Sequence, residues 1–273
     1  MAHNQTQQDE KKYKLSIITI CLNEPNVEKT CKSIVWQTNQ NFEWIVIDGG
    51  SNKETLDVFE KYKHRINKFI SEKDKGIYNA CNKGIRLAEG EFVLLINAGD
   101  TLYKETVIED IFKCGLSEDM VYGDYAINAQ LHNGDYGKLT TSFFMKGTLH
   151  TPATIVRKIL YEKYGYFDEK YKIASDFKAF ALFFKNNASY KYIPVIISDF
   201  DINGISSSKK NHKLLFKERR NIIEECFTQE EIQKEVNKPL ENSFLENIFS
   251  VKNTFDRKYK VITVLGIQFR IKI

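Results

Sequence analysis

The sequence predicts an α/β fold in which helices cover both faces of a mostly parallel sheet. Leu15–Cys21 is rich in β-branched residues and Phe92–Ile96 is apolar throughout, as is typical of strands buried on both faces. Between these runs, strand-like and helix-like segments alternate, which favours parallel strands joined by helices. The second run stops at Asn97-Ala98-Gly99-Asp100, and open α/β sheets bind ligands at such carboxyl ends.

The elements of the first half follow from short patterns in the chain. Pro25 breaks the first strand, and the two glycines after Asp48 form a tight turn in which backbone can approach a ligand closely. Gly90 ends the last helix of this half. We expect strands at residues 15–21, 42–47, 68–71 and 92–96, and helices at 27–36, 55–63 and 77–88.

The second half changes character, with short strands among Gly and Asn turns. The helix expected at 176–185 buries Phe177, Phe180, Ala181 and Phe184. We expect strands at 120–127, 134–141 and 192–197, short apolar pieces at 143–145 and 154–156, a turn at 164–168, and amphipathic helices at 214–227 and 230–237 before a break at Pro239.

The composition is that of a globular protein, since 42% of the 273 residues are hydrophobic and 13% are aromatic. We find no run of about 18 apolar residues that would predict a membrane span. Residues 1–14 lack the apolar core of a secretory signal, so we expect a disordered leader there. The five cysteines are scattered without a Cys-x-x-Cys pair, which indicates neither a zinc site nor a disulfide framework and fits a reducing cytoplasm.

Positive charge is concentrated toward the C-terminus. The net charge is +4, and residues 205–273 hold 14 Lys and Arg against 9 Asp and Glu. A basic tail on a nearly neutral body suggests a polyanion or an anionic membrane face, although an ordinary solvated helical surface is the simpler explanation. Neither Gly-x-Gly-x-x-Gly nor Gly-x-x-x-x-Gly-Lys follows the first strand, which disfavours a dinucleotide site and a P-loop.

Two aspartates have both a functional and a structural interpretation. Asp100, just past a central strand, suits a hard cation such as Mg²⁺ or Mn²⁺, which takes one or two protein carboxylates plus substrate phosphates. Alternatively, Asp100 caps a helix that starts at Thr101. Asp176 follows Ser175 at the start of an apolar helix, which is a good capping signal.

Five segments, in order along the chain, carry a pattern that resembles family 2 glycosyltransferases of the GT-A fold, bacterial enzymes of polysaccharide and lipopolysaccharide assembly. They are Ser16-Ile-Ile-Thr-Ile-Cys-Leu-Asn-Glu24, Trp44-Ile-Val-Ile-Asp-Gly-Gly-Ser51, Ser71-Glu-Lys-Asp-Lys-Gly-Ile-Tyr-Asn-Ala-Cys-Asn-Lys-Gly84, Gly90-Glu-Phe-Val-Leu-Leu-Ile-Asn-Ala-Gly-Asp100, and Gly165-Tyr-Phe-Asp-Glu169 with Ala174-Ser-Asp176. Each segment is a weak signal by itself, but five in the family's order form a strong one.

The resemblance covers residues 15–205 and implies two halves of one GT-A domain. Residues 15–103 would form a Rossmann-like, nucleotide-sugar-binding half with a mostly parallel central sheet, and residues 104–205 an acceptor-binding half. Residues 206–273 lie outside it, and we expect a helical extension and a basic–apolar C-terminal hairpin there.

The resemblance also assigns residues to the nucleotide. Asp48 matches the aspartate that bonds the donor's base, and its carboxylate suits the imide N–H of uracil, although a turn-forming aspartate is the structural alternative. Asn82 is equally compatible with a helix surface. The other residues assigned to the nucleoside or ribose are Thr19, Asn23, Glu24 and Asp74.

Asn97–Asp100 matches the family's Asp-x-Asp metal motif but departs from it, because Asn-Ala-Gly replaces the first aspartate. Asp100 would be the retained ligand of Mg²⁺ or Mn²⁺. Asn97 would accept a hydrogen bond from the ribose or coordinate the ion through its carbonyl oxygen. The departure puts the metal affinity in doubt.

Asp176 matches the catalytic base of inverting members of the family. Direct displacement at the anomeric carbon needs one base to take the proton of the acceptor hydroxyl, while the metal and backbone donors stabilise the leaving diphosphate. Asp124 and Asp168 are the rival bases.

Two further features lie near the expected junction of the halves. His150 would contact diphosphate, acceptor or metal, although a single histidine is more often structural. Lys209, Lys210 and His212 follow the Gly/Ser segment 204–208 and would close over the diphosphate, with a solvated linker as the alternative.

The resemblance thus implies an inverting hexosyl- or N-acetylhexosaminyltransferase that uses a nucleotide-sugar, in first place a UDP-sugar, and a glycan or lipid-linked acceptor. Two alternatives stay open: a non-catalytic carbohydrate-binding or scaffold protein on a degenerate transferase fold, and a sugar nucleotidyltransferase. The second would normally carry a Gly-rich loop where this chain has Leu22-Asn23-Glu24-Pro25. We expect a cytoplasmic location and no nucleic-acid partner.

Residues 258–273 differ from the rest of the chain. Beyond Gly266 the pattern alternates, with Ile267, Phe269, Ile271 and Ile273 on one face and Gln268, Arg270 and Lys272 on the other. With a turn at Gly266 this tail would form a hairpin, which is marginal in water by itself. It would therefore dock on the body, on a second subunit, or peripherally on the anionic inner face of the cytoplasmic membrane.

Overall fold

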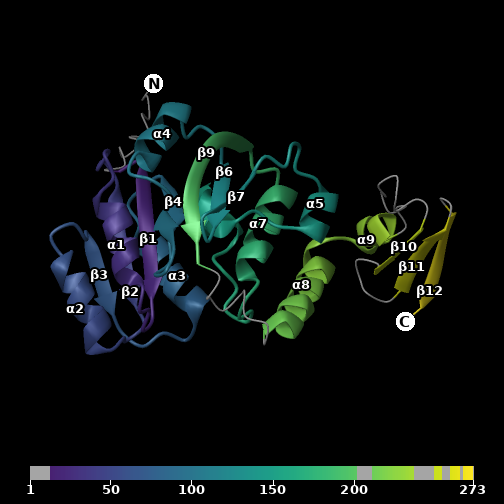
Figure 1. The fold of residues 1–273 in the computed structure, drawn as a ribbon, viewed down its shortest axis with the longest axis horizontal. Helices are drawn as coiled ribbons and strands as arrows, with labels where there is room; N and C mark the ends of the chain where they lie inside the picture. Colours follow the sequence, from purple (N-terminus) through teal and green to yellow (C-terminus); the bar gives the residue numbers. More distant parts are fainter. Residues whose placement is uncertain (1–12, 202–210, 237–248, 254–258, 265–266, 273) are drawn as a thin grey trace, which may run out of the picture.

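A computed structural model describes residues 13–201, 211–236, 249–253, 259–264 and 267–272. In these residues the strands form a central mixed sheet in the order β3-β2-β1-β4-β8-β6-β9-β5, with β7 paired to β6 (Figure 1). The predicted α/β class is therefore correct.

The first half is the parallel part of the sheet. β1 pairs in parallel with both β2 and β4, and β2 with β3, so the predicted alternation of strand and helix is confirmed. The elements are β1 (Leu15–Cys21), α1 (Val27–Val35), β2 (Glu43–Asp48), α2 (Lys53–Lys61), β3 (Lys68–Ser71), α3 (Ile77–Leu87) and β4 (Phe92–Leu95).

Helices cover both faces of this sheet because alternate strand residues point to opposite sides. Ile18 and Ile20 belong to the hydrophobic cluster that contains α3, whereas Ile17 belongs to the one that contains α1. Figure 1 shows α1 and α3 flanking β1. Contact with α3 is especially close at Gly84, where a Cβ would lie 2.4 Å from Cγ2 of Ile18.

The second half adds antiparallel pairs to the sheet. β8 lies antiparallel to β4 and β6, β6 is parallel to β9, and β5 is antiparallel to β9. Its elements are β5 (Thr101–Leu102), α4 (Val107–Cys114), β6 (Met120–Ile127), β7 (Gln130–His132), α5 (Thr141–Lys146), the 3-10 turn η1 (Thr151–Ala153), β8 (Thr154–Arg157), α6 (Ile159–Tyr164), α7 (Ser175–Lys185) and β9 (Tyr190–Phe200).

One predicted strand of this half is absent, and the helix-capping alternative for Asp100 does not hold. The expected strand at 134–141 is not formed: Gly134 donates to Oδ1 of Asp124, and Thr140 caps α5 by accepting from Phe143 N. The apolar piece 143–145 therefore lies in a helix. No helix starts at Thr101, since β5 pairs there with β9 and the next helix, α4, begins at Val107.

The C-terminal helices α8 (His212–Cys226) and α9 (Gln229–Val236) confirm the two amphipathic predictions. A three-stranded antiparallel sheet follows, formed by β10 (Phe249–Asn253), β11 (Tyr259–Val264) and β12 (Ile267–Lys272). Figure 1 shows it beyond α9, apart from the central sheet. The β11–β12 pair confirms the predicted hairpin, whereas β10 was not predicted.

Some predictions fall on positions that are not described. The leader up to residue 12, the Gly/Ser segment with Lys209 and Lys210, and the turn at Gly266 lie outside the described residues. In the helices of the described ranges, none is long and apolar enough to cross a membrane.

Candidate active site

The carboxyl ends of β1, β2, β4 and β9 bring four loops to one edge of the sheet, and Asp48 lies at the end of β2. Its Oδ2 accepts hydrogen bonds from Gly50 N, Ser51 N and the hydroxyl of Ser71 at 3.1, 3.0 and 2.6 Å. Its Oδ1 is buried and has no hydrogen-bond partner among the described residues. Such an atom is costly to bury unless a ligand supplies a donor.

The loop after β1 is tied to the loop after β2 by Asn23. Asn23 has a positive φ of 51°, and its Oδ1 accepts from Asn52 N at 2.7 Å, while its own N–H donates to Ser51 Oγ. Asp74 borders the same turn, because a Cβ on Gly49 would lie 3.2 Å from its Oδ2. Lys83 neutralises Asp74 through a 2.6 Å ion pair. These contacts bring Asn23, Asp48 and Asp74 together at one turn. All three are residues that the sequence analysis assigned to the nucleotide.

Asp100 lies at the end of β4 and is only 3% exposed. Burial raises its pKa to about 7; the carboxylate of Asp201 also raises it, while the hydrogen bond from Asp201 N and the charge of Lys29 act in the opposite direction. A Cβ on Gly99 would lie 3.5 Å from the carboxyl carbon of Glu24 and 3.8 Å from Cβ of Asp201. Several acidic side chains therefore border one tight turn.

The other member of the predicted metal motif, Asn97, holds this turn by accepting from Asp100 N at 2.9 Å through its backbone oxygen. Its side-chain Oδ1 is buried and lacks a hydrogen-bond partner in the described part of the chain. Asp100 and Asn97 thus offer oxygen atoms, the ligands that Mg²⁺ prefers. Within the described residues, no three His, Cys, Asp or Glu side chains are placed to hold a metal ion.

His150 lies directly before η1, and its ring contacts are with residues of the second half. Its ring stacks on Tyr125 at a centroid distance of 4.1 Å and meets the edge of Phe200 at 5.1 Å. Burial lowers its pKa to about 4, and the charge of His132 acts in the same direction, so the imidazole is neutral at pH 7. Its Nε2 is buried without a partner among the residues that the structure describes, which leaves it available to a ligand.

Asp176 lies in the first turn of α7 and is only partly buried. Its Oδ1 accepts from the hydroxyl of Tyr78 at 3.1 Å and from Phe177 N at 2.8 Å, and its Oδ2 accepts from Thr151 Oγ1 at 2.7 Å. Burial raises the pKa of Tyr78 well above its ordinary value, so Tyr78 stays protonated and keeps donating. The capping interpretation does not hold, because the N-cap of α7 is Ala174.

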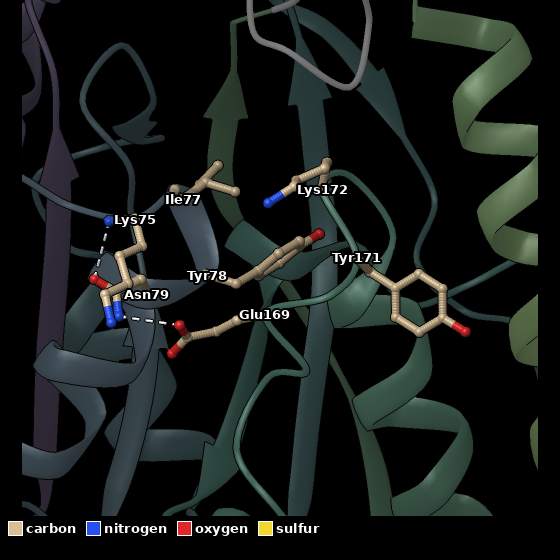
Figure 2. A pocket seen from close by; sticks show the side chains of 8 residues that line it. Lys75, Ile77, Tyr78, Asn79, Glu169, Tyr171 and Lys172 are labelled. Carbon is tan, nitrogen blue, oxygen red and sulfur yellow. Dashed lines mark hydrogen bonds between the residues drawn. The ribbon is translucent and has the colours of Figure 1, made fainter.

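A small notch lies beside Tyr78, between the start of α3 and the loop before α7. Figure 2 shows Lys172 reaching toward Ile77 above the ring of Tyr78, and Asn79 bonded to Glu169. Its volume of about 20 Å³ admits little more than one water molecule. The notch is lined by Lys75, Gly76, Ile77, Tyr78, Asn79, Glu169, Tyr171 and Lys172.

Several predicted residues are engaged elsewhere. Thr19 is fully buried inside β1 and accepts from Trp44 Nε1 at 3.1 Å. The side chain of Asn82 ties α3 to Phe167 through both a donated and an accepted bond. The structure therefore does not bring Thr19 or Asn82 to the edge of the sheet with Asp48.

The rival bases have their own partners. Asp124 Oδ1 accepts from Gly134 N and the hydroxyl of Tyr192. Burial acts to raise the pKa of Asp168, but the hydrogen bonds and charges of Lys178 and Lys170 together outweigh it, so the pKa is lowered. A carboxylate with a lowered pKa is a weaker base. His212 lies exposed at the start of α8.

Sequence reasoning missed three residues of this site. Tyr78 lies inside a segment that carries the family resemblance, and Thr151 directly follows His150, so both had a positional signal. Asp201 lies just past β9, which ends at Phe200. Because we predicted that this strand ends at residue 197, the sequence did not indicate that Asp201 lies at the edge of the sheet.

Comparison with known proteins shows which family the sequence matches. A family model described as "Glycosyl transferase family 2" matches residues 16–188. The "PGL/p-HBAD biosynthesis glycosyltransferase" of Mycobacterium bovis (strain BCG / Pasteur 1173P2) is 30% identical over 203 residues, which cover 71% of this chain and 79% of that protein.

Two solved structures show the same architecture. S. aureus TarS 1-349 in complex with UDP-GlcNAc superposes with a TM-score of 0.60 at 20% identity, covering 81% of this chain and 69% of that one. Mannosyltransferase PcManGT from Pyrobaculum calidifontis, in complex with GDP-Man and Mn²⁺, gives 0.54 at 16% identity, covering 76% and 60%. At these identities the likeness shows the fold alone, which is that of GT-A-like transferases.

Proposed function

The chain belongs to glycosyl transferase family 2 and is a glycosyltransferase, and from this premise we propose that it transfers a sugar from a UDP-sugar to a glycan or lipid-linked acceptor with inversion at the anomeric carbon. Family membership argues against the two alternatives raised by the sequence, a nucleotidyltransferase and a non-catalytic scaffold.

The buried, unpartnered Oδ1 of Asp48 is the observation that carries this proposal. The imide N–H of uracil is the donor that such an oxygen would need. Asn23, Ser51 and Asp74 surround the same turn, so a base bonded to Asp48 would lie against these loops. The complex of S. aureus TarS with UDP supports a uridine nucleotide by analogy.

A divalent cation fits the residues at the end of β4. Asp100 offers a carboxylate whose burial disfavours its negative charge, and Asn97 offers an unpartnered oxygen. Mg²⁺ is usually held by one or two carboxylates together with substrate phosphates. When bound, the ion would offset the charge on the leaving diphosphate. PcManGT, solved with Mn²⁺ and GDP-Man, supports this assignment by analogy.

In the proposed reaction Asp176 is the general base. The acceptor oxygen forms its bond to the anomeric carbon while the bond from that carbon to the diphosphate breaks. The proton of the acceptor hydroxyl passes to Asp176, whose orientation is held by Tyr78 and Thr151. His150, neutral and without a partner at Nε2 within the described chain, would donate to or accept from the diphosphate or acceptor.

We further propose that residues 258–273 bring the enzyme to an anionic membrane that holds a lipid-linked acceptor, as part of cell-surface polysaccharide assembly. The supporting observation is the amphipathic pattern of the β11–β12 hairpin.

A thermal-shift screen of UDP-, GDP-, dTDP- and CMP-sugars with Mn²⁺ tests the donor, since a true donor stabilises the folded state by mass action. We expect the largest shift with a UDP-sugar, and its loss in Asp48→Asn, because the amide replaces one of the acceptor oxygens. A shift that favours another nucleotide, or that Asp48→Asn retains in full, would reject the assignment of the base.

A further inference from the structure

Helix α8 lies beyond the family-matched residues 16–188. It nevertheless packs on α7, the helix that carries Asp176. Glu218 of α8 is only 6% exposed. Its Oε1 accepts from Lys172 N at 2.8 Å, and its Oε2 accepts from Ile173 N and Ala174 N at 2.9 and 3.0 Å. These three amides immediately precede Ser175, the first residue of α7.

Glu218 therefore satisfies backbone donors at a helix start where the N-cap residue offers no side-chain bond. A carboxylate at this end of α7 also complements the positive end of the helix dipole. Asp176 follows only two residues after the last amide that Glu218 holds. The direction in which Asp176 points thus depends on a residue of α8.

The neighbouring Arg219 supplies a second contact. Its guanidinium lies 4.4 Å from the ring centroid of Phe177, and its Nη2 donates to the backbone oxygen of Gly147 at 2.9 Å. Gly147 begins the segment that leads to Thr151, and Phe177 follows Asp176. Arg219 consequently joins the two chain segments whose side chains meet in the Thr151–Asp176 hydrogen bond.

Arg219 also brings positive charge to the base. Burial lowers the pKa of Arg219, while the negative charge of Asp176 raises it, and guanidinium stays charged at all ordinary pH values. Among the described residues, Tyr78 and Cys81 of α3 and Tyr161 of α6 also interact electrostatically with Asp176. Burial raises the pKa of each of these three, so they are neutral at pH 7.

We propose that Glu218 and Arg219 are positioning residues of the transfer reaction: Glu218 fixes the backbone that carries Asp176, and Arg219 holds the segments of Thr151 and Asp176 against each other. The proposal rests on the proposed role of Asp176 as the base. It makes α8, which no family motif covers, a required part of the active site.

The full-length protein tests this through the kcat and KM of donor hydrolysis, with water as the acceptor and the UDP-sugar that gives the largest thermal shift. In Arg219→Met we expect kcat to fall roughly tenfold, the low end of the usual contribution of a general base. The KM of the donor should stay within about twofold, because Arg219 lies on the acceptor side.

Arg219→Lys keeps the charge but not the planar guanidinium that lies over Phe177, so we expect it to recover kcat only in part. Arg220→Met is the matched control, because Arg220 is an exposed neighbour on α8 that pairs only with Glu224 in the described contacts, at 3.1 Å. If Arg219→Met does not fold, Arg219→Gln, which can still donate to Gly147, takes its place. A parent-like kcat in the folded variant would overturn the role of Arg219.

Glu218→Gln gives an independent test, with the exposed Glu224→Gln as its control. The amide of Gln has one acceptor oxygen, whereas both oxygens of Glu218 accept from backbone amides. We therefore expect a lower kcat with an unchanged donor KM. Glu218→Asp should recover part of kcat. Equal kcat for Glu218→Gln and Glu224→Gln would overturn the role of Glu218. An active Asp176→Asn would instead reject the proposed base, which separates failure of the proposed function from failure of this inference.

Discussion

At the scale of single residues, the site contains three aspartates whose hydrogen bonds and burial differ: Asp48, Asp100 and Asp176. Asp176 receives three hydrogen bonds, which suits an ionised carboxylate. Asp48 receives three on one oxygen and none on the other among the described residues. Asp100 is buried with another carboxylate nearby. These contrasts match one base, one nucleobase contact and one cation ligand.

Asp100 should make the protein lose stability as pH rises. Its pKa is raised from 3.8 to about 7, so between these values the folded state binds more protons than the unfolded state, and unfolding becomes easier with increasing pH. In buffer with chelator, we expect the melting temperature of the parent to fall from pH 4 to pH 7 relative to that of Asp100→Asn.

Adding Mn²⁺ at pH 7.5 should restore the melting temperature of the parent but not that of Asp100→Asn, because the ion favours the ionised carboxylate. The exposed Asp57→Asn is a suitable control, since among the described residues Asp57 pairs only with Lys53. Parallel pH curves for the parent and Asp100→Asn would show that Asp100 titrates normally. Full transfer activity in excess EDTA would contradict the metal.

Asp176→Asn tests the base most directly. The amide is nearly isosteric and cannot take the proton, so we expect kcat to fall by roughly 10²- to 10⁴-fold, with the thermal shift by the donor retained. Product analysis should show the anomeric configuration opposite to that of the donor. A loss of less than about tenfold would transfer the role to Asp124 or Asp168, and retained configuration would reject a single displacement.

A site residue could be predicted when its role follows from its own segment of the chain, but not when its role comes from contacts with residues far along the chain. Asp48, Asp100 and Asp176 follow strands or open a helix inside recognisable segments, so their positions along the chain carried the signal. Tyr78 and Glu218 are different, because their importance comes from contacts with residues far along the chain, Asp176 and Ala174. A charged residue on an amphipathic helix looks like solvent-exposed surface until the packing of α8 on α7 is known.

At the scale of elements, the first half was predictable and the second half less so. Strands β1 and β4 are buried on both faces, and such runs have few alternative structures. In the second half, side chains decided the outcome: Asp124 takes the amide of Gly134, and Thr140 starts α5. β9 even continues through the exposed Pro194, where its register with β6 shifts between Gly123 and Asp124.

Packing of α3 on β1 gives a prediction at this scale. A Cβ on Gly84 would meet Cγ2 of Ile18 at 2.4 Å, so Gly84→Ala should destabilise the fold by about 1–3 kcal/mol, as overpacking usually does. Urea unfolding measures the change. In an Ile18→Ala background, which removes that methyl group, the cost of Gly84→Ala should be smaller. Equal costs in both backgrounds would show that the contact does not limit the packing.

At the scale of the whole molecule, the catalytic body and the small C-terminal sheet have different patterns. Directly paired positions lie on the same face of a sheet, so the register places Phe249 with Val264, Val251 with Ile262, and Ile262 with Phe269. Ile267 pairs with Val264 on that face as well. Basic positions such as Lys252, Arg270 and Lys272 alternate with these along their strands. The register thus pairs apolar positions with one another across the three strands.

Deleting residues 258–273 tests whether an anionic membrane covers that face. Each Lys or Arg near such a surface contributes about 1 kcal/mol, so the truncated protein should sediment less with vesicles of phosphatidylserine and phosphatidylcholine and transfer more slowly to a lipid-linked acceptor. Hydrolysis of the donor should be unchanged, because the active site lies in the body. Arg270→Glu with Lys272→Glu, in the full chain, is the matched charge variant and should weaken binding without removing the strand. Vesicle binding equal to that of the parent, or a loss of the folded state, would make the tail a structural element and the membrane proposal wrong.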